Sequence, residues 1–159
     1  GAGRAMRNIE RATAEGSDRD ARWQMMMASL QGGMGFQKGL GAVHAMSHPL
    51  GGLAQPVLHH GTLNALILPA VLRFNADYCD DKYQRLAAVM GLSSEADLAA
   101  TIEDLNSRLG LPASLREVGV GDDVIPRMIE GAVADHSGAS NPRPASAEGY
   151  QALFAAAMG

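Results

Sequence analysis

The sequence predicts an all-α fold, a bundle of about seven helices joined by short loops. Aromatic residues make up only 4% of a chain that is 47% hydrophobic, so Ala, Leu, Met and Val must fill the core, as they do between packed helices. No stretch alternates apolar and polar residues with the period of two that a half-buried strand requires. At 159 residues the chain is long enough for one domain, which we predict to cover residues 1–159.

The first third of the chain predicts two helices. Residues 4–15 form the first, and Ser17 or Asp18 is expected to cap the second by accepting a bond from its free N–H groups. Three glycines, at positions 32, 33 and 35, then interrupt the helical pattern. They predict a break, or a close approach of the backbone to another helix or a ligand.

The central third predicts two more helices. The first begins at Leu40, and Pro49 is expected to end or kink it. After a glycine- and proline-rich loop, His60 or Thr62 opens a helix that continues to residue 75 and is kinked by Pro69.

Residues 80–90 are predicted to form a helix, and three further helices follow it. Ser94 and Asp97 resemble a capping box for a helix with a core stripe of Leu98, Ile102, Leu105 and Leu109. Asp122 and Ser146 are expected to cap the last two helices. The predicted inward residues of these two are Val124, Met128, Ile129, Ala132, Val133, Tyr150, Leu153, Phe154 and Ala157.

Four of the five histidines lie in an uncharged run between Lys38 and Arg73: His44, His48, His59 and His60. Neutral imidazole is the commonest metal ligand in proteins, and two histidines four apart on a helix project from one face and can share a metal. The glutamate that a zinc protease needs beside the first histidine is missing. The alternative interpretation is a set of hydrogen-bonded core histidines.

A metal site in this run needs ligands from elsewhere, because the run contains no carboxylate. The site stays incomplete unless Asp77, Asp80, Asp135 or another chain contributes. Asp135 and His136 are alternatively a solvated polar pair at the end of a helix.

Charge and apolar patterning exclude other classes of protein. The net charge of −4 includes no basic face, so we predict no nucleic-acid binding, and no apolar run is long enough to span a membrane. The single cysteine, Cys79, fits a reducing compartment, and we predict a cytoplasmic location. The chain starts without Met and enters a helical pattern at once, so the natural protein is expected to begin earlier.

The central motif resembles the iron-containing (group III) alcohol dehydrogenases, and the resemblance extends over nearly the whole chain. The segments that carry it are residues 39–52, His60-Gly61, Asn64-Ala65, Leu68-Pro69, Phe74-Asn75, residues 109–112 and Asn141-Pro142-Arg143.

The resemblance implies a two-domain enzyme, of which this chain is the all-helical C-terminal domain of a dehydroquinate synthase-like fold. The N-terminal domain that binds NAD or NADP is absent from the chain. A divalent metal, commonly iron and sometimes zinc, would be held by one Asp and three His, two of which match His44 and His60. His48 matches a histidine near the nicotinamide and the substrate that relays a proton, and the role of His59 stays open.

The missing Asp and His ligands would lie upstream, so the resemblance implies at most half of a metal site. We expect the chain alone to be inactive on the small alcohols or aldehydes of the full-length enzyme. Two alternatives to the alcohol dehydrogenase function remain. One is a relative of maleylacetate reductase or glycerol dehydrogenase, and the other is a non-catalytic helical interaction module. An apolar or glycine-lined patch at residues 32–48 predicts a homo-oligomer.

Overall fold

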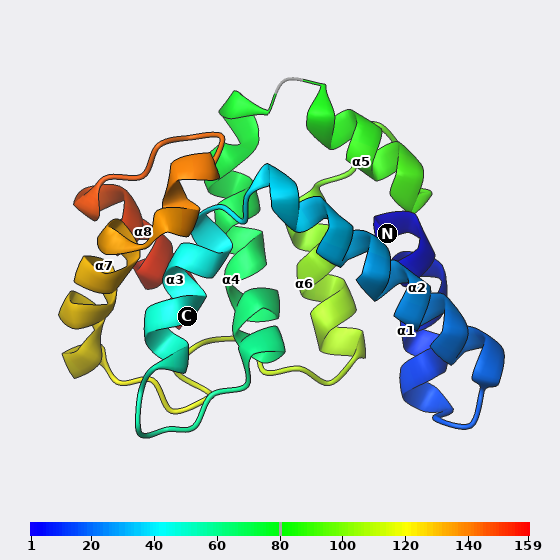
Figure 1. Ribbon diagram of the computed structural model, residues 1–159, viewed down its shortest axis with the longest axis horizontal. Coiled ribbons are helices and arrows are strands. Elements are labelled where there is room, and N and C mark those ends of the chain that lie inside the picture. The colour runs from blue at the N-terminus through cyan, green and yellow to red at the C-terminus, as the bar shows by residue number, and fades with distance from the viewer. Residues whose placement is uncertain (80) are drawn as a thin grey trace. The chain divides into compact units, whose positions relative to one another are not determined.

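Helices account for the regular structure of the chain (Figure 1). The computed structural model describes residues 1–79 and 81–159. This described part contains eight α helices and no strand, which confirms the predicted all-α class with one helix more than the approximate count of seven. The residues cluster into two compact units, residues 1–38 with 81–97 and residues 39–79 with 98–159. The assignment of residues 1–159 to a single domain stays a prediction.

The first unit contains α1 (Ala2–Ala14), α2 (Arg19–Gly35) and α5 (Lys82–Met90), and α1 packs against both of the others. Asp18 caps α2 as predicted, because its Oδ1 accepts a bond from the Ala21 N–H at 2.9 Å. The predicted start of α5 at Asp80 falls outside the described residues. α5 ends at Gly91, whose φ of +82° suits a glycine.

The three glycines of α2 were predicted to mark a break or a close approach to another helix or a ligand. The helix continues through Gly32 and Gly33 and ends at Gly35, and a Cβ added at any of the three would meet no atom within 4 Å. They therefore mark no close approach to another helix among the described residues, and an approach to a ligand stays a prediction. The tight approach in this unit is at Gly3, where a Cβ would collide with the carbonyl of Val89.

The second unit contains α3 (Ala42–Gly51), α4 (His60–Asn75), α6 (Leu98–Arg108), α7 (Ile125–Ala134) and α8 (Ala147–Met158). α4 contacts α3, α6 and α8, and α7 contacts α3 and α8. Short 3₁₀ helices lie at Ala76–Tyr78, Asp122–Val124 and His136–Ser140. The largest side chains that are fully buried in this unit are Met46, Leu50, Leu63, Ile67, Leu115, Val120, Met128 and Phe154.

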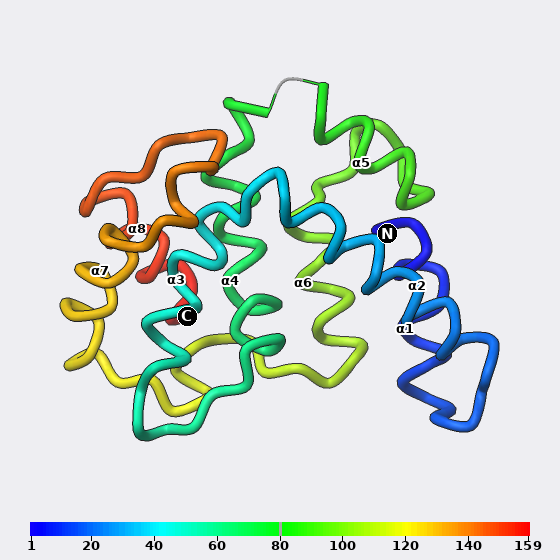
Figure 2. The backbone as a smooth tube through the Cα atoms, viewed as in Figure 1, coloured from blue at the N-terminus to red at the C-terminus, as the bar shows by residue number. Residues whose placement is uncertain are grey.

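The backbone between α3 and α4 runs as an open loop over residues 52–59 (Figure 2). Pro49 was expected to end or kink α3, but it lies inside the helix, which continues to Gly51. The N–H of Gly52 closes the last turn by donating to the carbonyls of His48 and Pro49 at 3.1 and 3.2 Å. Because a proline nitrogen carries no hydrogen, Pro49 removes a single helical bond, the one that would reach the carbonyl of Ala45.

Two further boundary predictions and one burial prediction differ from the structure. Ser94 does not start a helix, because its hydroxyl donates to Glu95 at 3.3 Å, and α6 begins only at Leu98. Asp122 pairs with Arg116 at 3.0 Å and begins a 3₁₀ helix instead of capping α7. Val133 was predicted to point inward but is 52% exposed.

The prediction for the last helix is confirmed. Ser146 caps α8 by accepting from the Gly149 N–H at 3.3 Å. Tyr150, Leu153, Phe154 and Ala157 are all buried, as their spacing predicted. Within the described residues, no helix combines the length and the apolar character needed to cross a membrane.

Candidate functional site

Three imidazole rings meet where α4 begins beside α3. His44 and His48 lie one turn apart on α3, with ring centroids 5.6 Å apart. His60, the first residue of α4, has its ring centroid 5.3 Å from that of His44 and 5.9 Å from that of His48. We refer to His44, His48 and His60 as the imidazole cluster. The structure thus brings together three of the four histidines that the sequence singled out.

The first turn of α3, which carries His44, is held by the loop that precedes α8. The N–H of Ala42 donates to the side-chain oxygen of Asn141 at 3.1 Å, and the N–H of Gly41 donates to the carbonyl of Ser137 at 3.0 Å. Gly41 has a φ of +78°, a left-handed conformation that favours glycine. The helix start is therefore fixed by residues almost one hundred positions later in the chain.

Asn64 lies one turn after His60 on α4 and links the two helices. Its amide nitrogen is 3.1 Å from Nε2 of His60 and 3.5 Å from Nε2 of His44. The Nε2 atoms of both rings therefore face the same small region. Two imidazole nitrogens in this arrangement can supply two of the three or four ligands that a divalent metal usually takes.

The surroundings of His44 keep its ring neutral. Burial lowers the pKa of His44 below its usual value, and the nearby rings of His60 and His48 lower it further. The more distant charge of Asp135 and a hydrogen bond to the backbone of Leu40 act in the opposite direction but do not outweigh these effects. A neutral ring retains the Nε2 lone pair that binds metal.

His48 has a carboxylate partner. Its Nδ1 is 2.9 Å from Oδ2 of Asp135, the residue that ends α7. The other carboxylate oxygen, Oδ1, accepts from the N–H of Ser137 at 2.8 Å. Burial opposes the ionisation of Asp135, but the hydrogen bonds from His48 and Ser137 outweigh it and hold the pKa of Asp135 below its usual value. Asp135 is therefore an anion at neutral pH.

His59 and His136 lie outside the imidazole cluster. His59 is the N-cap residue of α4, where its Nδ1 accepts from the N–H of Thr62 at 3.4 Å. His136 is largely exposed, its Nδ1 is 3.9 Å from Asp135, and its ring stacks at 6.5 Å on that of His48. The structure therefore gives His59 a local role at the helix start, which the sequence had left open.

The cluster by itself is not a complete metal site. Among the described residues, no group of three or more His, Cys, Asp and Glu side chains is arranged to hold a metal ion. Asp135 is one of the carboxylates that the sequence predicted as a further ligand, and its Oδ2 is hydrogen-bonded to Nδ1 of His48. Asp77 follows His60 by 17 residues, about 25 Å along a helix at 1.5 Å per residue. Asp80 lies outside the described residues.

The sequence did not predict that Asn64 contacts His44 and His60 or that Asp135 pairs with His48. Asn64 carried a usable signal, because it is four residues after His60 and must share its helix face. Asp135 carried none, since 87 residues separate it from His48.

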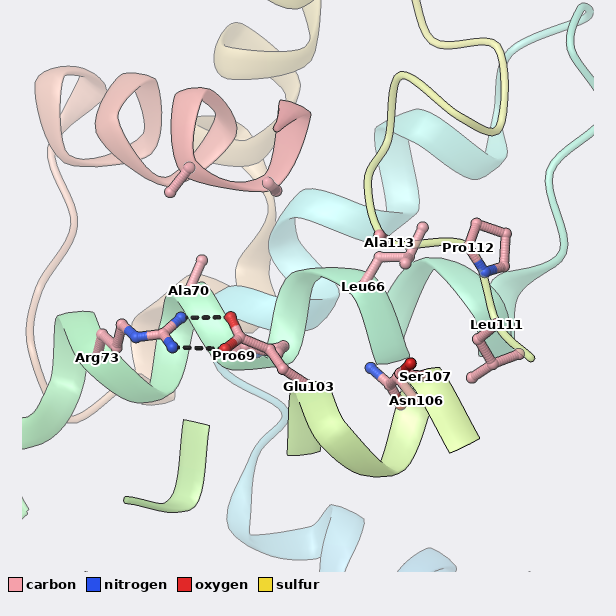
Figure 3. A pocket seen from close by; sticks show the side chains of 12 residues that line it. Leu66, Pro69, Ala70, Arg73, Glu103, Asn106, Ser107, Leu111, Pro112 and Ala113 are labelled. Atoms are coloured by element: carbon pink, nitrogen blue, oxygen red, sulfur yellow. Dashed lines mark hydrogen bonds and ion pairs between the residues drawn. The ribbon is translucent and has the colours of Figure 1, made fainter. Parts of the chain in front are cut away.

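A separate cavity of about 430 Å³ lies between α4, α6, α8 and the loop at Leu111–Ala113 (Figure 3). One end is closed by Arg73, whose two terminal nitrogens each donate to an oxygen of Glu103 at 2.6 Å. No histidine of the imidazole cluster lines it. Leu66, Pro69 and Ala70 give its wall an apolar character. The cavity is therefore distinct from the histidine site.

Comparison with known proteins places this geometry in a family. Residues 4–158 match the C-terminal model of the Fe-containing alcohol dehydrogenase family. The chain is 52% identical over 158 residues to a 4-hydroxybutyrate dehydrogenase of Cupriavidus necator, covering 95% of this chain and 41% of the relative. It is 40% identical over 146 residues to a lactaldehyde reductase of Escherichia coli K12, covering 86% of this chain and 38% of the relative.

Solved structures agree with the sequence relatives. A 1,3-propanediol oxidoreductase superposes with a TM-score of 0.90 and 38% identity, over 98% of this chain and 43% of the other. An alcohol dehydrogenase from Oenococcus oeni superposes with a TM-score of 0.88 and 32% identity over 98% and 42%. The chain spans about two fifths of the length of the curated relatives it matches. The chain thus belongs to the Fe-containing alcohol dehydrogenase family, of which it represents the C-terminal, all-helical part.

Proposed function

We propose that this chain is the metal-binding C-terminal domain of an NAD(P)-dependent alcohol dehydrogenase. In this role His44 and His60 hold a divalent metal, iron in the first place and zinc as the alternative, through their Nε2 atoms. The observation that carries the proposal is the convergence of these two atoms on the amide of Asn64. The remaining ligands come from the part of the full-length protein that this chain does not contain.

The chemistry divides between the metal, the nicotinamide and His48. When bound, the metal supplies Lewis acidity to the oxygen of the alcohol or aldehyde. NAD or NADP, when bound, would supply a nicotinamide ring able to accept hydride, and His48 would accept the proton of the alcohol. His48 suits this task because an imidazole exchanges protons near neutral pH and because its side chain is still 36% exposed.

The substrate of the full-length enzyme is a small alcohol or its aldehyde. Identity of 52% to a protein named 4-hydroxybutyrate dehydrogenase favours a short hydroxy acid within this class. A likeness to maleylacetate reductase, with a TM-score of 0.81 and 27% identity, keeps that reaction as the alternative. We expect the chain alone to be inactive, since it spans only about two fifths of the length of the relatives it matches.

Metal titration of the purified chain tests the central part of the proposal. Calorimetry with Co²⁺ or Zn²⁺ is expected to show weak binding that His44→Asn and His60→Asn each reduce by at least about tenfold. This threshold is conservative, because losing an outer partner of a metal ligand already costs about 10- to 100-fold. His59→Asn is the matched control, since asparagine is also a good N-cap residue for α4.

Two outcomes contradict the proposal. If His59→Asn weakens metal binding as much as His60→Asn does, the metal is not held by the imidazole cluster. If neither His44→Asn nor His60→Asn changes the affinity, the chain serves as a helical interaction module instead.

Turnover of an alcohol with NAD by the isolated chain would contradict its inactivity, and a version extended upstream is expected to gain both metal affinity and activity.

A further inference from the structure

Asp135 and His48 come from segments that meet at a close helix contact. A Cβ added at Gly131 of α7 would lie 2.7 Å from Cβ of Pro49 on α3, so the two helices can approach this closely only because residue 131 has no side chain. Pro49 follows His48 directly, and Asp135 lies one helical turn after Gly131. The contact between the helices therefore brings the carboxylate of Asp135 next to the His48 ring.

The carboxylate is fixed at both oxygens. Oδ1 accepts from the Ser137 N–H at 2.8 Å, and Oδ2 lies 2.9 Å from Nδ1 of His48. The side chain of Asp135 is only 14% exposed, so water competes weakly for these bonds. An ionised carboxylate can only accept hydrogen bonds, so Nδ1 of His48 must be the donor.

We propose that Asp135 is the positioning residue of His48, holding the proton on Nδ1 so that Nε2 stays free to accept a proton. This inference deepens the proposed function and rests on it for the role of His48 in proton transfer. The tautomer itself is a property of this chain and can be measured without substrate, metal or nucleotide.

The geometry predicts the result of one isosteric substitution. In Asp135→Asn, the side-chain oxygen must stay on the Ser137 N–H, because a buried backbone donor keeps an acceptor where it can. The amide NH₂ then faces His48 and donates to Nδ1, which transfers the ring proton to Nε2. The substitution thus keeps the ring in place and exchanges its tautomer.

The test is long-range ¹H–¹⁵N correlation spectroscopy of the ¹⁵N-histidine-labelled, metal-free chain at about pH 8, where a free imidazole is neutral. We expect wild-type His48 to carry its proton on Nδ1 and Asp135→Asn to carry it on Nε2. His136→Gln is the control, because His136 also lies near Asp135 but is exposed, and it is expected to leave the His48 tautomer unchanged.

The wild-type spectrum decides the inference even if the variant does not fold. A proton on Nε2 of wild-type His48 overturns it, and so does an unchanged tautomer in a folded Asp135→Asn chain. In the full-length enzyme, Asp135→Asn is then expected to lower kcat by about 10- to 100-fold, by analogy with the partners of metal-binding histidines, with metal content and KM unchanged. If the tautomer exchanges but kcat does not fall, the positioning holds and the proposed role of His48 in proton transfer is wrong.

Discussion

Two buried asparagines fix the start of the helix that carries His44. The side-chain oxygen of Asn141 accepts from the Ala42 N–H and from the amide of Asn75, both at 3.1 Å. Its amide nitrogen donates at 2.7 Å to the side-chain oxygen of Asn75 and at 2.7 Å to the carbonyl of Arg143. One side chain thus joins the first residue of α3, the last residue of α4 and the loop before α8.

Asn141→Ala is expected to destabilise the chain by about 3 kcal/mol, because it leaves several buried polar groups without partners at about 1–3 kcal/mol each. Asn106→Ala removes a single bond, from the Asn106 amide to the carbonyl of Ala65 at 2.9 Å, and is expected to cost about 1 kcal/mol. Urea unfolding of both variants followed by circular dichroism measures the difference. Equal losses would show that Asn141 does not link these segments.

The sequence predicted the residues of the site where the signal was local. His44 and His48 follow from their spacing of four on one helix, and His60 lies in the same uncharged run. The family resemblance favoured His60 over His59 as the ligand and included Asn141 in a matched motif. The pair of Asp135 and His48 depends on how α7 packs against α3, which no local pattern encodes. Asp135 was predicted as a further metal ligand or as part of a solvated polar pair. Its side chain is only 14% exposed and lies 2.9 Å from His48, so it is not solvated, and its role as a metal ligand stays a prediction.

At the scale of the elements, the contact between α3 and α7 controls the geometry of the cluster. Gly131 faces Pro49 so closely that an added Cβ would lie 2.7 Å from Cβ and 3.3 Å from Cγ of the proline ring. A proline ring is rigid and cannot rotate away, so a larger residue at position 131 must push the helices apart. Such a shift separates Asp135 from His48.

Gly131→Ala is expected to destabilise the chain by about 1–3 kcal/mol, the usual cost of overpacking, despite the higher helix propensity of alanine. Gly32→Ala is the matched control, since this glycine also lies within a helix but has open space around it. The control is expected to stabilise the chain by about 0.5–1 kcal/mol. Thermal unfolding of the two variants gives changes of opposite sign, and stabilisation by both would contradict the close contact.

Helix ends were less predictable from sequence than the helices themselves. Pro49 and the glycines of α2 disfavour helix, yet they lie within helices. Each lies in the last turns of its helix, where few helical bonds depend on it. Ser94 and Asp97 have the spacing of a capping box, but the serine bonds to its neighbour Glu95 instead. The spacing of apolar residues gave the reliable signal, as the buried stripe of α8 illustrates.

At the scale of the whole molecule, one face of α2 presents exposed apolar side chains. Trp23, Met26, Leu30 and Met34 follow one another at helical spacing and are each more than half exposed, and Phe36 beyond the helix is too. The exposed patch therefore overlaps the predicted one only between residues 32 and 36, because the stretch from Ala42 to His48 is buried or half-buried. A face of this kind favours association.

We expect the isolated chain to self-associate through this face of α2. Leu30→Glu combined with Met34→Glu should weaken association by at least about 100-fold, because each apolar side chain of this size contributes about 1.5–3 kcal/mol when buried. Val57→Glu combined with Val133→Glu is the control, since these valines are exposed but lie outside α2. Sedimentation velocity over a range of concentrations distinguishes the cases. A wild-type chain that stays monomeric at high concentration would contradict self-association, and an equal loss in the control would place the interface elsewhere.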